Sequence, residues 1–496
     1  MTQINTDVTP RDLVLGATDV ARVAAASSRT LASRWPEDRG TPVFTVGGEY
    51  TTRGWTEWTQ GFQYGIAILA GEMLGDDERI AWARAKTIER MAPHLTHTGV
   101  HDHGFNNVST YGNLLRLARG SVADNSAGGA AKNTVGAGSP IGTASETDFY
   151  ELALKVSGAV QVARWTELPD ELGYVPSFNG AHSLFADTIR SMRSPAVAYK
   201  IGHKLLGEQD KNISLLRRLL QHAETTARYN VYFGTGRDGY DVAGRVVHES
   251  IFNPKSGSYR CPSTQQGYSP FTTWTRGLSW VVTGFAELVE FALLLTDDEV
   301  AKAGLSYFAT KKQLLERLLS VAVMTGNFFL DCSCSDGVPY WDTGAPGIDP
   351  ETLKKPASPY TVTEPIDASA SAIAASGLLR MGHCLTKRRG ELEAAGVAVA
   401  GPLSEEVGRR LYQGGLTIAS TLFGDTYLAT DEGHEGVLLH SVYHHPNRWD
   451  HIPEGASAPA GESSMWGDYH LVELALLISR LADGGYYSPF DCVAGR

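Results

Sequence analysis

Two aspartates in this chain stand in surroundings that could support acid–base chemistry. Asp102 lies between two imidazoles in the segment His101-Asp-His-Gly-Phe105, and Asp187 lies in a largely apolar segment that begins at Phe185. Burial among apolar side chains raises the pKa of a carboxyl, and a general acid at neutral pH needs a raised pKa. The surroundings of Asp187 therefore predict a general acid, and the alternative for Asp187 is a buried, paired carboxylate. For Asp102, the alternative is a helix cap.

A second group of side chains is typical of a carbohydrate site. Gln266 and Arg276 lie within ten residues of each other, and Arg276 could bind a carboxylate through both of its amino groups. Trp274 and Trp280 could stack on a sugar ring. Other tryptophans fall near expected loop edges, where each alone is more often a packing residue: Trp55, Trp58, Trp165, Trp341, Trp449 and Trp466.

Possible metal ligands are sparse and poorly spaced. Cys332 and Cys334 form a C-x-C pair without a second cluster nearby, and a zinc site needs about four ligands. His440 and His444 would share one face of a helix, but no H-E-x-x-H glutamate accompanies them and Pro446 follows. The chain also has no P-loop and no G-x-G-x-x-G motif. We therefore predict no metal and no cofactor.

The overall composition limits the possible partners and compartments. The formal net charge is -12, and no basic block occurs, so nucleic acid and anionic membranes are poor candidates as partners. No apolar run approaches the length of a membrane span. The N-terminal segment lacks the pattern of a secretory signal, and the five cysteines are an odd number, so we predict free thiols and a cytoplasmic location. The oligomeric state stays open.

Apolar residues recur at helical spacing along most of the chain, and no alternation of valine and isoleucine marks a large sheet. About a dozen helices without a linker predict an all-α fold in a single domain over residues 1–496. The clearest helical segments are 12–31, 61–74, 212–232, 277–295, 311–330, 369–382, 405–423 and 470–482.

Two segments lack this period and are predicted to be irregular inserts. Residues 121–147 are rich in glycine, alanine and serine, which predicts a surface excursion or a flexible lid. Residues 339–367 are rich in proline, aspartate and threonine, and such a loop either borders a site or is plain decoration.

Several motifs together resemble those of the unsaturated glucuronyl hydrolases, glycoside hydrolase family 88, with the unsaturated rhamnogalacturonyl hydrolases of family 105 as cousins. The resemblance runs from about Trp55 to Leu477, and the longest match lies between His248 and Glu287. The other motifs, in order, are Trp58-Thr-Gln-Gly-Phe62, His101-Asp-His-Gly-Phe105, Ala186-Asp-Thr-Ile-Arg-Ser-Met192, His222-Ala-Glu-Thr-Thr-Ala-Arg228, Pro339-Tyr-Trp-Asp342, the segment from Asp367 to Ser376, Gly436-Val-Leu-Leu-His440 and Glu462-Ser-Ser-Met-Trp-Gly-Asp-Tyr469.

The resemblance implies an (α/α)6 barrel and an unusual reaction. The substrate is a small oligosaccharide from a polysaccharide lyase, whose terminal uronic acid carries a C4=C5 double bond. A proton goes to C4, water adds at C5, and the resulting hemiketal opens and expels the rest of the sugar. Asp187 resembles the proton donor and water activator, and Asp102 the second aspartate, which holds sugar hydroxyls. Side chains that resemble the pocket residues are Trp58, Phe105, Trp165, His222, Gln266, Arg276 and Trp280.

The sequence departs from the family pattern at several positions. His103 replaces the usual leucine, and Gln265 stands where histidine is common, so the leaving sugar, its linkage and its sulfation stay open. Unsaturated rhamnogalacturonyl hydrolysis is an alternative activity. A sugar epimerase of similar architecture is another, for which His222 and His440 could serve as acid and base. A non-catalytic sugar-binding protein is a third, although both aspartates are present.

Overall fold

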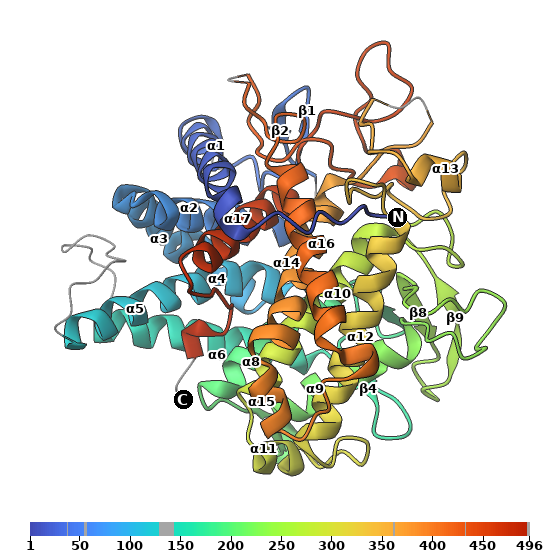
Figure 1. The fold of residues 1–496 in the computed structure, drawn as a ribbon. Coiled ribbons are helices and arrows are strands. Elements are labelled where there is room, and N and C mark those ends of the chain that lie inside the picture. Colours follow the sequence, from blue (N-terminus) through green and yellow to red (C-terminus); the bar gives the residue numbers. More distant parts are fainter. Residues whose placement is uncertain (37, 54–56, 128–142, 361–362, 432, 494–496) are drawn as a thin grey trace.

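The computed structural model describes residues 1–36, 38–53, 57–127, 143–360, 363–431 and 433–493. Helices dominate these residues, and the strands form only small sheets of two or three members (Figure 1). The prediction of a helix-rich chain without a large sheet is confirmed. Trp55 and most of the glycine-rich insert lie outside the described residues.

The long helices divide into buried and amphipathic ones. Every residue of α10 (Thr275–Leu293) from Thr275 to Ala292 is buried, whereas α9 (Leu215–Tyr229) has a polar outer face. A helix that is apolar on all sides belongs in the interior, and one with an apolar stripe belongs outside it. The other long helices are α1 (Val14–Arg34), α2 (Gln60–Leu74), α3 (Asp77–Arg90), α5 (Asn113–Ala127), α6 (Ala144–Ala163), α12 (Lys311–Cys332), α14 (Ala368–Lys387), α16 (Glu405–Leu422) and α17 (Met465–Ala482).

Neighbouring long helices pack side by side through much of the molecule. α10 contacts α12 and α14, α14 contacts α16 and α17, and α17 contacts α1 and α2 (Figure 1). Some of these contacts are very close: a Cβ added at Gly377 of α14 would lie 2.8 Å from the Cα of Thr283 in α10. Glycine at this position therefore lets two backbones approach more closely than any side chain would allow.

Short helices and strands connect the long helices and carry much of the site described below. The short helices are η1 (Pro10–Leu13), η2 (Glu57–Thr59), α4 (Ala92–Leu95), the π-helix η3 (Gly104–Gly112), α7 (Thr188–Ser191), α8 (Arg193–Lys200), η4 (Glu208–Asp210), α11 (Asp297–Lys302), α13 (Pro350–Leu353), α15 (Arg389–Ala394), η5 (Gly401–Leu403), η6 (His445–Asn447) and η7 (Asp491–Val493). The strands are β1 (Phe44–Val46) with β2 (Glu49–Thr51), β3 (Thr166–Glu167) with β4 (Gly173–Tyr174), β6 (Leu205–Leu206) with β7 (Asn212–Ile213), and the antiparallel sheet β5-β8-β9 (Ser183–Phe185, Glu249–Phe252, Tyr259–Ser263).

The two predicted inserts contain more structure than their composition indicates. α5 continues to Ala127 and α6 begins at Ala144, so helix occupies both ends of 121–147. In 339–367, Tyr340 pairs with Ile366, and α13 begins after Asp349, whose side chain caps it. The prediction of irregular structure was wrong at these positions, because local capping and backbone pairing supply hydrogen bonds that a residue count does not show.

Ionised groups fill part of the interior. Arg190 pairs with Glu473 at 2.8 Å and with Glu287 at 3.0 Å, and Arg380 pairs with Glu290 at 3.0 Å. All of these side chains are almost fully buried. Buried charges of this kind are tolerated only when they are paired, so these residues fix the relative positions of the elements that carry them.

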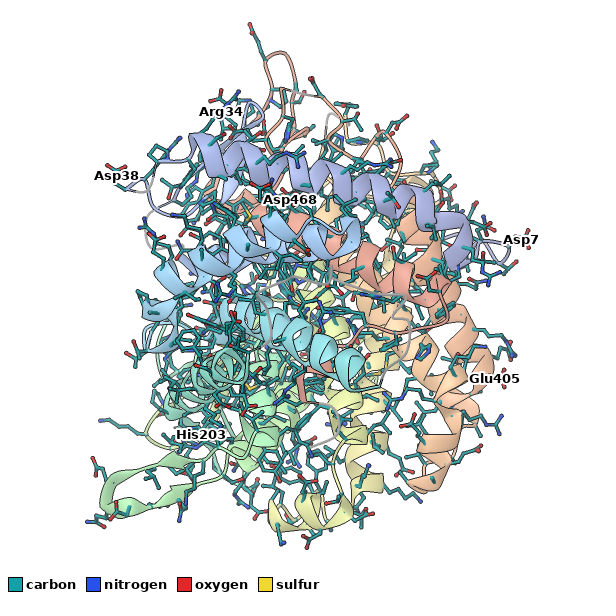
Figure 2. All side chains as sticks on the ribbon, turned by 90° about the vertical axis from the view of Figure 1, so that its left-hand side faces the viewer. Asp7, Arg34, Asp38, His203, Glu405 and Asp468 are labelled. Atoms are coloured by element: carbon teal, nitrogen blue, oxygen red, sulfur yellow. The ribbon has the colours of Figure 1, made fainter. Side chains whose placement is uncertain are left out.

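Asp468 shows how strongly the interior affects a carboxyl. It lies well inside the outline of the molecule, whereas Asp7, Asp38 and Glu405 lie at its edge (Figure 2). Burial raises the pKa of Asp468 to about 7, although it accepts hydrogen bonds from Tyr50 and from the backbone of Val437 and Leu438. Among the described residues, no helix is long and apolar enough to cross a membrane.

Candidate active site

One cavity brings together residues from five distant parts of the chain. Seven of the nine predicted site residues contribute to its wall: Asp102, Asp187, Trp58, Phe105, Gln266, Arg276 and Trp280. The remaining wall residues are Val100, His101, Phe178, Phe185, Gln265, Trp274, Tyr443, His444, Asn447 and Trp449. Carboxylates, an amide pair and several aromatic rings therefore face a common space.

His101 lies between the two aspartates. Its Nε2 is 3.4 Å from Oδ2 of Asp187 and 3.6 Å from Oδ1 of Asp102. All three residues are buried, with 2% of His101, 6% of Asp102 and 9% of Asp187 exposed. Oδ1 of Asp187 and Nδ1 of His101 have no hydrogen-bond partner among the described residues. The arrangement is a buried carboxyl–imidazole–carboxyl triad in which one carboxylate oxygen of Asp187 has no hydrogen-bond partner among the described residues.

The predicted raised pKa of Asp187 was wrong. Burial alone would raise the pKa of Asp187, but the hydrogen bond and positive charge of His101 lower it below its usual range. The apolar sequence neighbours correctly indicated burial, but they did not show an imidazole that is 86 positions away in the chain.

Asp102 and His101 both have raised pKa values. Burial raises the pKa of Asp102, and although His101 opposes this effect, the nearby negative charge of Asp187 adds to it. Burial disfavours the charged imidazole of His101, but Asp102 and Asp187 outweigh that cost and raise its pKa. Asp187 is therefore the carboxyl that ionises more readily.

His248 was not among the predicted site residues, although it begins the longest matched segment. Its ring packs against Phe185 at 4.5 Å and Trp274 at 4.6 Å, measured between centroids, and both partners line the cavity. Its Nδ1 accepts a hydrogen bond from the backbone N–H of Gln265 at 3.1 Å, so the proton of the neutral ring lies on Nε2. Burial lowers the pKa of His248. His248 thus stands directly behind the wall as a neutral imidazole.

Aromatic rings form one side of the cavity. Phe105 packs against Trp280 at 4.9 Å between centroids, and Trp58 stacks on Trp466 at 5.2 Å with an interplanar angle of 22°. Trp58 also contacts Phe105. These contacts fix the orientation of rings that could otherwise rotate, so the wall is preformed.

Arg276 is already fully engaged by the protein. Its guanidinium pairs with Asp367 at 2.9 Å and donates to the side chain of Gln266 and to backbone carbonyls of Val442 and Tyr443. It also stacks on the ring of Trp274, with 4.6 Å between the guanidinium carbon and the ring centroid. Arg276 therefore ties α10 to the loop at 442–443, and it presents a positive charge at the wall without a free bidentate edge.

Two predicted pocket residues do not line the cavity. Trp165 lies under the guanidinium of Arg218 at 4.9 Å and packs against Gly173. His222 is fully buried; its Nδ1 accepts from the backbone of Val175 at 3.2 Å, and burial lowers its pKa to about 3. The side chains on this part of the wall come instead from Phe178 and Phe185.

Residues 440–444 are not helical, so His440 and His444 do not share one face of a helix. His440 bonds to the backbone of Thr426 and Gly461, whereas His444 lines the cavity with an unpartnered Nδ1. The described residues contain no group of three or more histidine, cysteine, aspartate or glutamate side chains placed to hold a metal ion.

Backbone contacts beneath the cavity hold the two aspartates near each other. The N–H of Gly104 donates to Oγ of Ser191 at 2.7 Å, and Gln161 bridges Ser191 and the carbonyl of His101 at 2.9 Å each. Arg193 donates to the carbonyl of Gly104 at 2.9 Å. The turn with Asp102 is therefore joined directly to the short helix α7 that follows Asp187.

This combination of a helix-rich fold, a carboxyl triad and an aromatic wall defines the chain as a candidate carbohydrate-active protein. No family model matches it. The unsaturated glucuronyl hydrolase of Bacillus sp. (strain GL1) is 28% identical over 241 residues, which are 48% of this chain and 48% of that protein. The one from Formosa agariphila is 24% identical over 256 residues, 51% of this chain and 46% of that protein. The matched segment thus spans about half the length of these curated relatives.

Solved structures extend the likeness to nearly the whole fold. The structure of a variant of UGL, an unsaturated glucuronyl hydrolase, with dGlcA-Glc-Rha-Glc has a TM-score of 0.64 at 21% identity. The match covers 97% of this chain and 99% of that chain. The unsaturated glucuronyl hydrolase from Bacillus sp. GL1, responsible for the degradation of glycosaminoglycan, has a TM-score of 0.61 at 21% identity, with 97% and 100% covered. The predicted resemblance to unsaturated glucuronyl hydrolases is confirmed, and the chain shares their fold.

Proposed function

We propose that this chain is a glycoside hydrolase that releases a 4,5-unsaturated uronic acid from the non-reducing end of lyase-generated oligosaccharides. The observation that carries the proposal is the triad of Asp102, His101 and Asp187 in a cavity walled by aromatic rings. The relatives and solved structures named above support the same class of activity.

In the proposed reaction, Asp187 gives a proton to C4 of the vinyl ether. Positive charge develops at C5 and the ring oxygen, and the carboxylate left on Asp187 stabilises it electrostatically. Asp187 then takes a proton from the water that adds at C5, and the hemiketal opens and releases the remaining sugar. Asp102 holds sugar hydroxyls. The proton on Asp187 is restored at the end of the cycle, so the residue acts as acid and then as base.

Asp187 must be protonated for this first step, and the substrate itself favours that state. The uronic acid brings a carboxylate into a cavity whose wall already holds two carboxyls. A like charge at close range raises the pKa of a carboxyl. We infer that the negative charge of the substrate opposes the lowering of the Asp187 pKa that His101 causes, and that Asp187 takes up a proton from solvent as the substrate binds.

The fold around this site is proposed to be an (α/α)6 barrel of family 88 type in a single domain, which agrees with the helix pairings and with the similarity to the solved structures. The cytoplasmic location stays a prediction. The epimerase alternative has less support, because His222 and His440 both bond to backbone groups and neither lines the cavity. Unsaturated rhamnogalacturonyl hydrolysis differs in the leaving sugar and stays open.

The test is turnover of an unsaturated glucuronyl disaccharide, followed by loss of the ultraviolet absorbance of its double bond. We expect wild-type protein to consume it, and Asp187→Asn to lower kcat by at least about a hundredfold because the proton donor is lost. In heavy water, one deuterium should enter C4 on a single face, whereas direct attack at the anomeric carbon would release an unsaturated sugar that tautomerises in solution and takes up deuterium on both faces.

Asp468→Asn is the control, since Asp468 is also buried but lies outside the cavity wall. It should keep most of the activity. No turnover of unsaturated pectin, glycosaminoglycan or exopolysaccharide fragments, or turnover without deuterium at C4, would contradict the proposal.

A further inference from the structure

We propose a second sugar-binding surface outside the cavity, formed by Tyr240, Tyr268 and Phe271 and here called the outer platform. It would bind a pyranose ring on the leaving side of the substrate, beyond the ring next to the cleaved bond. This inference rests on the proposed function of the cavity and adds a preference for chains longer than a disaccharide.

The exposure of these three rings is unusual for aromatic side chains. Tyr240 is 52% exposed, Tyr268 is 51% exposed and Phe271 is 43% exposed. Tyr240 and Phe271 stack on each other, with 4.5 Å between centroids and an interplanar angle of 25°. A clustered apolar surface in contact with water marks a binding site more often than a single exposed ring does.

The outer platform is continuous with the cavity. Tyr268 and Phe271 lie in the connection between β9 and α10. Gln266 and Trp274, which lie on either side of them in this connection, both line the cavity. Three residues of chain span at most about 11 Å, so Phe271 lies within that distance of Trp274, measured between Cα atoms. A sugar chain that leaves the cavity past this wall therefore meets the platform.

Ring contacts also connect Tyr268 with the part of the cavity wall that contains His444. Tyr268 meets Trp341 edge to face at 6.5 Å, and Trp341 meets His445 at 4.7 Å, both between ring centroids. His445 follows His444, which lines the cavity. Aromatic rings thus continue from the cavity wall outward to the exposed platform.

Hydrogen bonds hold the two loops that carry the outer platform, one with Tyr240 and the other with Tyr268 and Phe271. Tyr268 N–H donates to Asp342 at 2.9 Å, and Phe271 N–H donates to Oγ of Ser269 at 3.1 Å. Arg245 bridges the two loops, because it donates to the carbonyls of Tyr240 at 2.8 Å and of Thr272 at 3.3 Å. Rings held in place in this way lose little entropy on binding, so even a shallow stacking contact contributes affinity.

The experiment compares an unsaturated disaccharide with an unsaturated tetrasaccharide of the same first linkage. Phe271→Ala and Tyr240→Ala should lower kcat/KM for the tetrasaccharide about five- to tenfold, the loss expected from one exposed ring face, and leave the disaccharide within about twofold. Phe149→Ala is the matched control, since Phe149 is 41% exposed on α6, which lies on the other side of the molecule from β8 and β9 (Figure 1). It should change neither value.

The outcomes separate this inference from the proposed function. If wild-type protein cleaves both sugars and Phe271→Ala leaves their ratio unchanged, the outer platform is wrong and the cavity assignment stands. If neither sugar is cleaved, the proposed function fails, and calorimetric titration of the tetrasaccharide decides the platform: equal heats for wild type and Phe271→Ala overturn it. Light scattering that shows a wild-type dimer and a Phe271→Ala monomer would assign the rings to a contact between two copies and would also overturn it.

Discussion

Gly104 is the position where a single added methyl group should separate the two aspartates. A Cβ at Gly104 would lie 2.3 Å from the carbonyl oxygen and 2.6 Å from the Cα of Ser191. Ordinary contacts begin at about 3.4 Å, so the backbones must move apart by about 1 Å. Asp102 stands two residues before Gly104, and Ser191 belongs to the short helix that follows Asp187. The displacement is therefore transmitted to the triad.

The expected effect of Gly104→Ala is large on activity and moderate on stability. A displacement of about 1 Å between reacting groups costs roughly a hundredfold in rate. Overpacking of a buried contact costs about 1–3 kcal/mol of unfolding free energy. We expect kcat/KM on an unsaturated disaccharide to fall about a hundredfold while urea denaturation still shows a folded, cooperative protein at the assay temperature.

Gly112→Ala is the matched control in the same helix. A Cβ there would approach only the Cγ1 of Val108 at 3.0 Å, and that side chain can adjust. It should keep activity within about threefold, because it displaces no backbone at the triad. Wild-type kcat/KM in Gly104→Ala, or equal losses in both variants, would refute the idea that this glycine sets the distance between the aspartates.

Two further predictions concern buried charge. His101→Gln should destabilise the protein most below pH 6.5, the ordinary pKa of histidine. Because the pKa of His101 is raised in the folded protein, the stability that its charged form contributes is lost as pH rises through that folded pKa. A destabilisation that stays constant between about pH 5 and 9 in urea titrations would contradict this. Arg380→Met leaves Glu290 buried without its cation and should cost about 3–5 kcal/mol of unfolding free energy. Arg389→Met breaks an exposed pair and should change the unfolding free energy little. Similar losses in urea denaturation would show that the buried pair has no special role.

The long helices were predictable because their apolar period is strong. The predicted segment 277–295 corresponds to α10, and 405–423 corresponds to α16 within one residue. The segment 369–382 ended too early, since α14 continues past Gly382 to Lys387. A Cβ at Gly382 would lie 2.5 Å from Tyr412, so this glycine allows close helix contact instead of ending the helix.

The π-helix η3 was not predictable from the same pattern. Its nine residues, Gly104–Gly112, include several polar side chains, yet all of them are buried. Each polar group needs a partner there: Asn106 bonds to His94, Asn107 bonds to Ser157, and Thr110 bonds back to its own helix. Polar composition argues for an exposed loop, and only the surrounding residues reveal that these side chains find hydrogen-bond partners inside the protein.

At the site too, the sequence indicated which types of residue are present but not which of them contact each other. The family motifs pointed to Asp102 and Asp187 and, on the aromatic wall, to Trp58, Phe105 and Trp280. They did not point to Phe178, Phe185 or Tyr443. They also favoured His222 over His248, although both occur in matched segments, since nothing local distinguishes a buried structural imidazole from one behind the cavity wall.

The opposite pKa shifts of the two aspartates follow from the same principle and bear on how the site works. Both carboxyls are buried, so burial cannot distinguish them; His101 lies within 3.4 Å of Asp187 and forms its hydrogen bond there, and this contact favours ionisation of Asp187 over Asp102. With His101 charged and both aspartates ionised, the triad carries one net negative charge, and an incoming uronate adds a second in the same small cavity. Uptake of one proton from solvent relieves that repulsion, and Asp187 is the carboxyl with an unpartnered oxygen. The lowered pKa of Asp187 is thus compatible with an acid role, because the substrate's charge arrives at the step for which Asp187 must be protonated.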